Sequence, residues 1–325
     1  YKTGTIISTA NAMLINTWII NMTGDQNVAL YGTNMSGVTS TYGISNSGTI
    51  TMGNSSSINN PNVALYADGD TKSVSNSGTI TMGANTIGMY GHEASVTGGS
   101  LTVGDGGVGI YSQSKNVTLS GGTITVGGNE AVGVYTVGNS QTIINSGTSI
   151  NIGNTSYGFV NVGTGNSITS SLTNNTLGSE SVYIYSSDLT GTVTNSTNLI
   201  STGSQNYGIY SAGTVNNSGN MDLSSGVGNV GIYSVSGGTA TNIGTINLNA
   251  DNTTGIFLDN GAKGYNHGTI TTGAPGLNNV VGVYVSNGAE LENHGSIIIN
   301  ATNGIGTYFK GGTVANYGTI NVTGA

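Results

Sequence analysis

The stretch Asn46-Ser-Gly48-Thr-Ile50-Thr-Met52 decides the fold, because it recurs along the chain at a nearly constant spacing. Its pattern is Asn-x-Gly-Thr-Ile-x-φ, where φ is an apolar residue. Clean copies begin at Asn46, Asn76, Asn242, Asn266, Asn293 and Asn316, and looser copies at Thr97, Ser120, Asn145, Asn174, Asn195 and Asn217. The third position advances 270 residues, from 48 to 318, in eleven steps, or about 24.5 residues per repeat. A fixed period of this length predicts a repeat architecture.

A second unit, φ-Gly-φ-Tyr, lies between consecutive copies of the first, as in Val108-Gly-Ile-Tyr111. Its fourth position is aromatic in eleven of twelve copies. These aromatic residues are Tyr31, Tyr66, Tyr90, Tyr111, Tyr135, Tyr185, Tyr210, Tyr233, Phe257, Tyr284 and Tyr308. We expect them to form one continuous row, buried or half-buried, in which Tyr90, Tyr111 and Tyr135 align on successive turns.

Both units alternate small or polar residues with apolar, often β-branched ones, which is typical of short strands. Two or three such strands per turn, stacked by parallel pairing, predict an all-β fold: a right-handed parallel β-helix of about 13 rungs of roughly 24 residues. The isoleucines of the first unit should stack inward. A further ladder of side-chain amides is expected at a bend, from Asn46, Asn76, Asn145, Asn174, Asn195, Asn217, Asn242, Asn266, Asn293 and Asn316. The glycine two residues later fits a positive φ or a close backbone approach.

We divide the chain into residues 1–17, one or more incomplete first rungs, and residues 18–325, the β-helix repeats. The last rung, Asn316-Tyr-Gly-Thr-Ile320, is as regular as any other, and a solenoid that ends naturally carries a polar cap. The chain is therefore interpreted as a fragment of a longer passenger. No segment is long and apolar enough for a membrane helix, so no membrane insertion of this segment is expected.

The composition excludes several classes of protein. Charged residues are only 6%, with 13 carboxylates and 5 lysines, and there is no arginine, so nucleic-acid binding is not expected. No cysteine is present, which excludes disulfides and thiolate metal sites. With 35% hydrophobic residues the chain can still bury a core.

The two alternating units resemble the passenger repeats of type V autotransporter adhesins, and most closely those of the large fusobacterial outer-membrane adhesins. The resemblance covers nearly the whole chain. It implies an extracellular position at the bacterial cell surface, on a passenger anchored in the outer membrane by a downstream β-barrel. It also implies as partners a host cell-surface protein or glycan receptor and other bacteria.

The sequence offers few groups of residues that could carry out catalysis or bind a metal ion. Polysaccharide lyases of the β-helix fold need clustered carboxylates for Ca²⁺ and a base, and these residue types are scattered here. The densest charge, Asp68-Gly-Asp70-Thr-Lys72, offers too few oxygen ligands for a Ca²⁺ loop and reads as a solvated turn. His267 and His294 occupy matching repeat positions and are expected to stack on neighbouring rungs. We therefore expect no enzyme activity, no catalytic residue, no metal and no cofactor.

Loops that lengthen the repeat without breaking its pattern are the candidates for binding. They span residues 32–45 and 161–173 after the aromatic residue, and residues 53–62 and 273–280 before the next aromatic strand. The candidate partner contacts are Asp68, Asp70, Lys72, His92, Pro61, Pro275, Asp259, Lys263 and Lys310. The predicted function is a non-enzymatic surface adhesin segment. The alternatives are a purely structural spacer of a surface fibre and, third, a polysaccharide-degrading β-helix enzyme.

Overall fold

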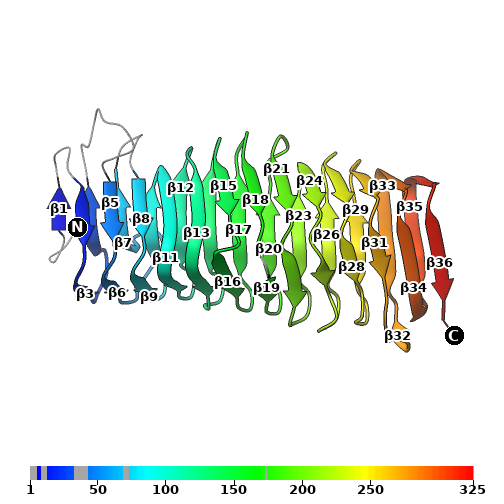
Figure 1. Ribbon diagram of the computed structural model, residues 1–325, viewed down its shortest axis with the longest axis horizontal. Helices are drawn as coiled ribbons and strands as arrows, with labels where there is room; N and C mark the ends of the chain where they lie inside the picture. Colours follow the sequence, from blue (N-terminus) through cyan, green and yellow to red (C-terminus); the bar gives the residue numbers. More distant parts are fainter. Residues whose placement is uncertain (1–5, 9–12, 33–42, 69–72, 173, 325) are drawn as a thin grey trace. The chain divides into compact units, whose positions relative to one another are not determined.

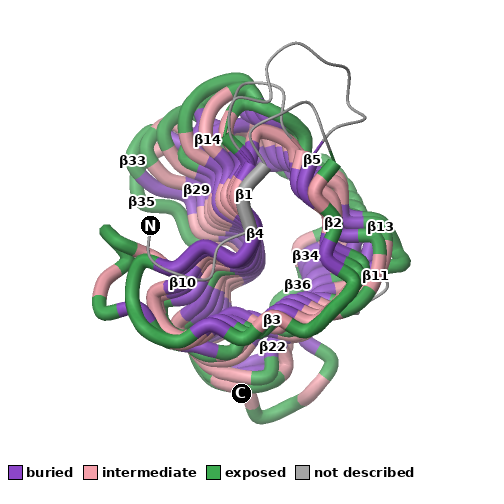
Figure 2. The backbone as a smooth tube through the Cα atoms, turned by 90° about the vertical axis from the view of Figure 1, so that its left-hand side faces the viewer, coloured by how far each residue is buried: buried purple, intermediate pink, exposed green. Residues whose placement is uncertain are grey.

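A computed structural model describes residues 6–8, 13–32, 43–68, 73–172 and 174–324. These residues contain no helix, and they form a parallel β-solenoid of about eleven turns, slightly fewer than the sequence predicted. Figure 1 gives the strand labels. In Figure 2, which looks along the axis from the N-terminal end, the chain runs clockwise through β2, β3 and β4 as it recedes, so the helix is right-handed. The predicted fold class is confirmed. Since no helix is present in the described part, none is available there to span a membrane.

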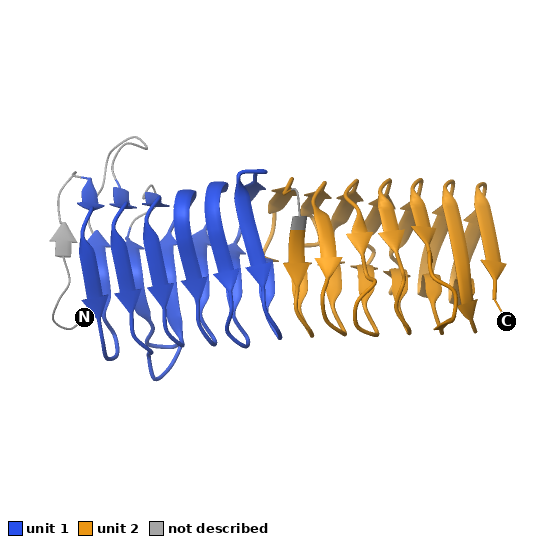
Figure 3. Cartoon of the chain, turned by 60° about the horizontal axis from the view of Figure 1, so that its bottom comes forward, with its two compact units in different colours: residues 1–160 blue, residues 161–325 orange. Residues whose placement is uncertain are grey.

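The chain divides into two compact units, residues 1–160 and 161–325 (Figure 3). Each unit repeats the same turn of three strands. We name the strands by the residue that marks them: the Tyr strands carry φ-Gly-φ-Tyr, the Asn strands end at the amide ladder, and the Thr-Ile strands carry Gly-Thr-Ile.

Within each unit the Tyr strands pair in parallel and place their aromatic residues in a row. Ile110 and Ser112 are fully buried, so Tyr111 between them points to the outer face and is half-buried. The rings stack in each unit, with centroids 5.1 Å apart for Tyr90–Tyr111 and 5.4 Å apart for Tyr111–Tyr135. In unit 1 the Tyr strands are β1 (Ile6–Ser8), β4 (Val28–Gly32), β7 (Asn62–Ala67), β10 (Thr86–Gly91), β12 (Val108–Gln113) and β14 (Val132–Val137). Unit 2 has β20 (Val182–Ser186), β23 (Tyr207–Ser211), β26 (Val230–Ser234), β29 (Thr254–Leu258) and the first parts of β33 (Val281–Asn293) and β35 (Ile305–Asn316), while β17 (Tyr157–Val162) carries the unit boundary.

The Thr-Ile strands supply the inward isoleucines. Ile50, Ile80 and Ile124 are fully buried in unit 1, and Ile246 and Ile270 in unit 2. The strands of unit 1 are β3 (Ile19–Met22), β6 (Thr49–Met52), β9 (Thr79–Met82), the second parts of β11 (Glu93–Val103) and β13 (Val117–Val126), and β16 (Thr148–Ile152). Those of unit 2 are β19 (Asn174–Leu177), β22 (Asn198–Ser201), β25 (Met221–Asp222), β28 (Thr245–Asn247), β31 (Thr269–Thr271), β34 (Ser296–Thr302) and β36 (Thr319–Thr323).

The Asn strands lie on the side of the β-helix that follows the Tyr strands, where the sequence predicted the long loops 32–45 and 161–173. Ile168 is buried at 1% exposure and pairs with Val193, so residues 167–170 are strand, and the predicted long loop 161–173 is wrong over this part. The unit 1 strands are β2 (Leu14–Asn16), β5 (Gly43–Asn46), β8 (Ser73–Asn76), the first parts of β11 and β13, and β15 (Gln141–Ile144). The unit 2 strands are β18 (Ser167–Ser170), β21 (Thr192–Asn195), β24 (Thr214–Asn217), β27 (Thr239–Asn242), β30 (Lys263–Asn266) and the later parts of β33 and β35. Residues 33–42 of the other predicted loop lie outside the described residues.

A ladder of side-chain amides, most of them buried, closes many of the Asn strands. Each Nδ2 donates to the Oδ1 of the next rung and to the backbone carbonyl two residues ahead, so Asn217 donates to Asn242 at 2.9 Å and to Gly219 at 3.0 Å. Unit 1 links Asn16, Asn46 and Asn76 in this way, each bond at 2.8 Å. Unit 2 links Asn195, Asn217, Asn242, Asn266, Asn293 and Asn316.

Two asparagines predicted for this ladder do not belong to it. Asn145 is exposed, because Ile144 before it takes the ladder position opposite Leu119. Asn174 lies on β19 and pairs with Asn198 of the next Thr-Ile strand. The motif alone therefore does not fix which residue turns inward.

Close backbone approach explains the glycine of the Asn-x-Gly unit. A Cβ on Gly78 would lie 2.1 Å from the Gly48 carbonyl oxygen of the preceding rung. At this bend the backbones of successive rungs therefore lie against each other, with no room for a side chain between them. Of the two explanations that the sequence left open, close approach applies at this position.

We predict that Asn217→Ala lowers the free energy of unfolding by about 2–4 kcal/mol, because it leaves the buried amides of Asn195 and Asn242 short of a partner. The matched control is Asn145→Ala in the same Asn-Ser-Gly sequence, which is exposed and should change stability by less than about 0.5 kcal/mol. Urea-unfolding midpoints compare the two. Equal midpoints would contradict the role assigned to the ladder.

Candidate binding surface

A cleft lies beside the Tyr strands of unit 1, under the long connection of residues 53–62. It has a volume of about 380 Å³. The connection supplies Asn59, Asn60 and Pro61 to its rim, and β7 and β10 supply its wall. The lining residues are Gln26, Asn59, Asn60, Pro61, Val63, Tyr66, Ile87 and Tyr90. They are amides, apolar side chains and tyrosines, with no charged group among them.

Buried Asn62 anchors the end of this connection. Its Nδ2 donates to the carbonyls of Gly24 and Gly53, both at 2.9 Å, and its Oδ1 accepts from the Asn27 backbone at 2.8 Å. Within the loop, Ser55 Oγ donates to the Asn60 carbonyl at 2.8 Å. The rim of the cleft is therefore held in place from inside the β-helix.

The tyrosines present their edges, not their faces, to the surroundings. Tyr66 and Tyr90 stack with centroids 4.6 Å apart and planes at 5°, and Tyr31 and Tyr111 continue the stack on either side. The ring faces are thus covered by neighbouring rings. What the row offers a ligand is ring edge and phenolic hydroxyl.

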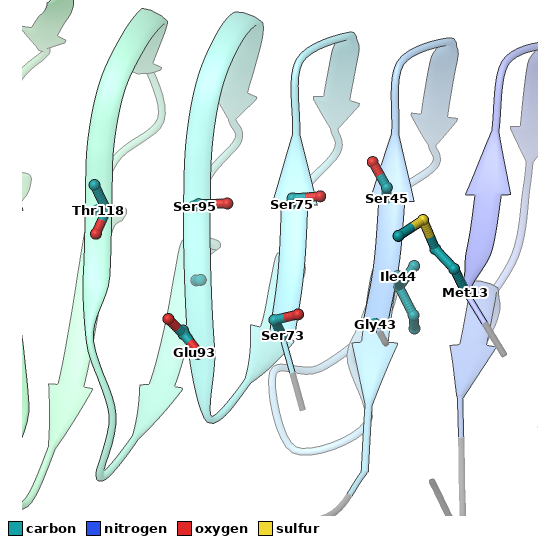
Figure 4. A pocket seen from close by; sticks show the side chains of 10 residues that line it. Met13, Gly43, Ile44, Ser45, Ser73, Ser75, Glu93, Ser95 and Thr118 are labelled. Atoms are coloured by element: carbon teal, nitrogen blue, oxygen red, sulfur yellow. The ribbon is translucent and has the colours of Figure 1, made fainter. Parts of the chain in front are cut away.

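A second, smaller groove of about 250 Å³ lies on the outer face of the Asn strands of unit 1 (Figure 4). Ser45, Ser75, Ser95 and Thr118 occupy the same register position on successive strands. Glu93 is the charged residue among those that line it. A row of hydroxyls with one carboxylate can form hydrogen bonds, but it does not provide paired carboxylates for acid–base chemistry.

The predicted contact residues divide between two corners of the helix. In unit 1, Asp68 and His92 follow Tyr strands, whereas Pro61 precedes one and lines the cleft. Asp70 and Lys72 lie outside the described residues. Of the described residues in this set, Pro61 is one that lines the cleft.

In unit 2, charge gathers on the outer face of β30 and β33. Lys263 Nζ lies 3.2 Å from Glu290 Oε2, and Glu292 Oε2 lies 3.2 Å from His294 Nε2. The hydrogen bond and charge of Glu290 raise the pKa of Lys263. Lys263 begins β30 and pairs in register with Glu290, 27 residues further along the chain, so no local motif in the sequence indicates this ion pair. These groups are surface-exposed, which limits their contribution to stability.

Asp259 and Lys310 lie at the corner after the Tyr strands of unit 2. The hydrogen bond from Ser286 lowers the pKa of Asp259 most, burial opposes it, and Asn287 and the Asn260 backbone add to the lowering. Lys310 is exposed on β35, beside Ser286 in register. The carboxylate of Asp259 therefore accepts hydrogen bonds from residues of its own corner of the β-helix.

Pro275 is exposed in the long connection of unit 2. The connection continues the sheet, since β32 (Leu277–Asn278) pairs with Ala301 and Thr302. Asp251 Oδ1 also accepts from the Asn278 backbone at 2.8 Å. The two long connections at this corner thus differ in what they build.

The histidine stack expected from the sequence is present. The rings of His267 and His294 lie 4.9 Å apart at 13°, and Tyr317 continues the stack beyond His294. Within the described residues, no group of three or more His, Asp or Glu side chains is arranged to hold a metal ion.

A family model, the BigA third pectate lyase-like domain, matches residues 92–325 of the chain. The chain belongs to this family. No curated protein and no solved structure matches it. The pectate lyase-like description of the BigA domain agrees with the parallel β-helix seen here. The cleft residues, from Gln26 to Tyr90, all precede the matched stretch.

The cleft could not be located from the sequence beyond its loop. Gln26 and Asn60 are 34 residues apart, and the turn brings them together. Gln26 also has a φ of 58°, a left-handed conformation that recurs before Tyr strands at Asn85 and Glu130. Several residue types occupy this position, so no sequence signal marks it.

Asp188 closes a buried corner of unit 2 with four hydrogen bonds. It accepts from the backbone N and the Nδ2 of Asn166, at 2.7 and 3.0 Å, and from the backbone N and the Oγ1 of Thr190, both at 2.8 Å. Burial works to raise the pKa of Asp188, but these hydrogen bonds outweigh it and the pKa is lowered. A lowered pKa means that the carboxylate stabilises the fold above its unfolded pKa near 3.8 and loses that contribution as the pH falls through the folded value.

We therefore predict that Asp188→Asn lowers the free energy of unfolding at pH 7 by about 1–3 kcal/mol, because an amide cannot accept all four bonds. The parent protein should hold its stability between pH 5 and 9 and lose stability only below about pH 4, and the variant should lose less there. Urea unfolding at several pH values measures both. Exposed Asp68→Asn is the control, and cooperative acid unfolding near pH 5 would count against this account.

Proposed function

We propose that the chain is a non-enzymatic adhesive segment of a bacterial surface protein. In this proposal the segment is displayed outside the cell, on a type V autotransporter passenger like those of the large fusobacterial adhesins. It contacts host-cell receptors, protein or glycan, and partner bacteria. The β-helix is the rigid support and the connections at its corners make the contacts.

One observation carries the proposal: an insertion into the repeat forms a cleft without disturbing the paired amides of the ladder. The amide ladder satisfies its donors and acceptors between rungs. The connection of residues 53–62 leaves that ladder intact and adds Asn59, Asn60 and Pro61 to a concave surface. Membership of the BigA third pectate lyase-like family supports a β-helix of this kind.

The absence of enzyme activity is part of the proposal. The lysines of the chain are few, and Lys263 is paired with Glu290 on an open sheet face. Incubating the chain with pectate and Ca²⁺ tests this directly. Release of unsaturated oligogalacturonides that disappears in Lys263→Ala would favour the enzyme instead.

The alternative function is a spacer that holds a distal binding region away from the membrane. The charge-poor, repetitive surface favours it wherever no corner is elaborated. If the segment is adhesive, shortening the long connections at its corners reduces binding to cells. If it is a spacer, shortening them has no effect on binding.

We predict that trimming residues 54–61 to the two residues of the next rung, Ala84-Asn85, leaves the fold intact and reduces binding of the chain to host cells or partner bacteria at least fivefold. Solenoid stability is a sum over rungs and their interfaces, so the loop contributes little to it. Circular dichroism checks the fold, and flow cytometry with labelled protein measures binding. The matched control shortens residues 273–280 in unit 2. If both trimmed proteins fold and bind like the parent, the spacer is the better description.

A further inference from the structure

We infer that the cleft between residues 53–62 and the outer face of β7 and β10 is a binding site for a neutral saccharide of one or two sugar rings. The inference rests on the proposed adhesive function and assigns to it a site and a class of ligand. The cleft precedes the stretch that matches the BigA family, so the family does not assign it.

The lining determines the charge of the ligand. Gln26, Asn59 and Asn60 offer amide donors and acceptors, and no lysine, aspartate or glutamate lines the cleft. A charged ligand would lose hydration here without gaining a counter-charge, which is costly. Neutral hydroxyl groups match amides as both donors and acceptors.

The apolar part of the lining suits the C–H face of a sugar ring. Val63 is buried, and Ile87 and Pro61 are half-buried. These three side chains form an apolar wall of the cleft. The phenol edges of Tyr66 and Tyr90 lie beside this wall, because their faces are covered within the stack. Recognition would therefore combine hydrogen bonds to hydroxyls with contact against the aliphatic wall, without ring stacking on tyrosine.

The cleft is of suitable size and is formed in advance. Its volume of about 380 Å³ falls at the lower end of the roughly 300–1,000 Å³ of small-ligand sites. Asn62 and Ser55 hold the rim through buried or half-buried hydrogen bonds, so little order has to be imposed on binding. An unanchored surface loop would not have this advantage.

The test uses the whole chain and named sugars. Glucose, galactose, mannose and their disaccharides are compared with galacturonic acid and neuraminic acid by saturation-transfer NMR and titration calorimetry. We expect millimolar or tighter binding of at least one neutral sugar, and at least tenfold weaker binding of its acidic counterparts. If no neutral sugar binds, or the acidic sugars bind better, the assignment is overturned.

Two tryptophan variants locate the binding. Ile87→Trp fills the cleft from the outer face of β10, and Val108→Trp makes the same change at the paired position of β12, outside the lining. The first should weaken sugar binding at least tenfold and the second less than twofold. Asn60→Ala and Gln26→Asn, which retains a residue suited to positive φ, test the rim by a smaller change. Equal effects of the two tryptophans, with both rim variants unchanged, would overturn the site.

Cell binding separates failure of the site from failure of the proposed function. If the parent and Ile87→Trp bind cells equally well, the saccharide site is wrong and the adhesive function stands. If neither binds any host cell or partner bacterium while the parent still binds a sugar in the cleft, the site stands and the adhesive function is wrong.

Discussion

The structure depends on one constraint: every rung must place its buried groups directly over those of the rung before it. Parallel backbone pairing sets the spacing, and the side-chain amide ladder fixes the register, since an Nδ2 that donates both to the next Oδ1 and to a carbonyl two residues ahead can do so in one alignment. A slip of one residue would turn Ile50 and Ile80 outward and leave Asn46 and Asn76 unpaired inside. The isoleucine core and the outer tyrosine row follow from that register.

The strands that could be predicted from the sequence are those marked by a residue type that recurs from repeat to repeat. The Tyr and Thr-Ile strands were found because each carries a residue type that recurs at its position, and stacking of like on like follows from the period. The Asn strands were largely missed, because alternations such as Ser73-Val-Ser-Asn76 are short and polar on their outer face. Asn145 shows the limit of motif reading: its motif matches that of Asn217, yet Ile144 fills the inward position, since a buried apolar group needs no hydrogen-bonding partner.

The candidate site was predictable only as an interval of residues. Pro61 belongs to a loop that the sequence marked as unusually long, and it does line the cleft. Gln26, Val63 and Ile87 come from three different rungs, and their meeting depends on where the loop folds back. Asp259 and Lys263 were predicted as contacts because they lie on the side of the repeat that follows the aromatic residue. The structure engages both of them with neighbouring side chains, so their position in the repeat does not show that they are available to a partner.

The two long connections at the corner before the Tyr strands show why insertion length alone does not make a site. Residues 273–280 contain β32, which pairs with β34, so the added chain is absorbed into the sheet and leaves Pro275 on an open surface. Residues 53–62 end instead on Asn62, whose buried amide bonds Gly24 and Gly53 and holds the loop as an arch beside the tyrosines. An insertion can form a concave surface when its ends are fixed in the core and its middle has no neighbouring strand to pair with. In the connection of residues 53–62 a buried asparagine fixes one end, by the same amide chemistry that holds the rungs in register.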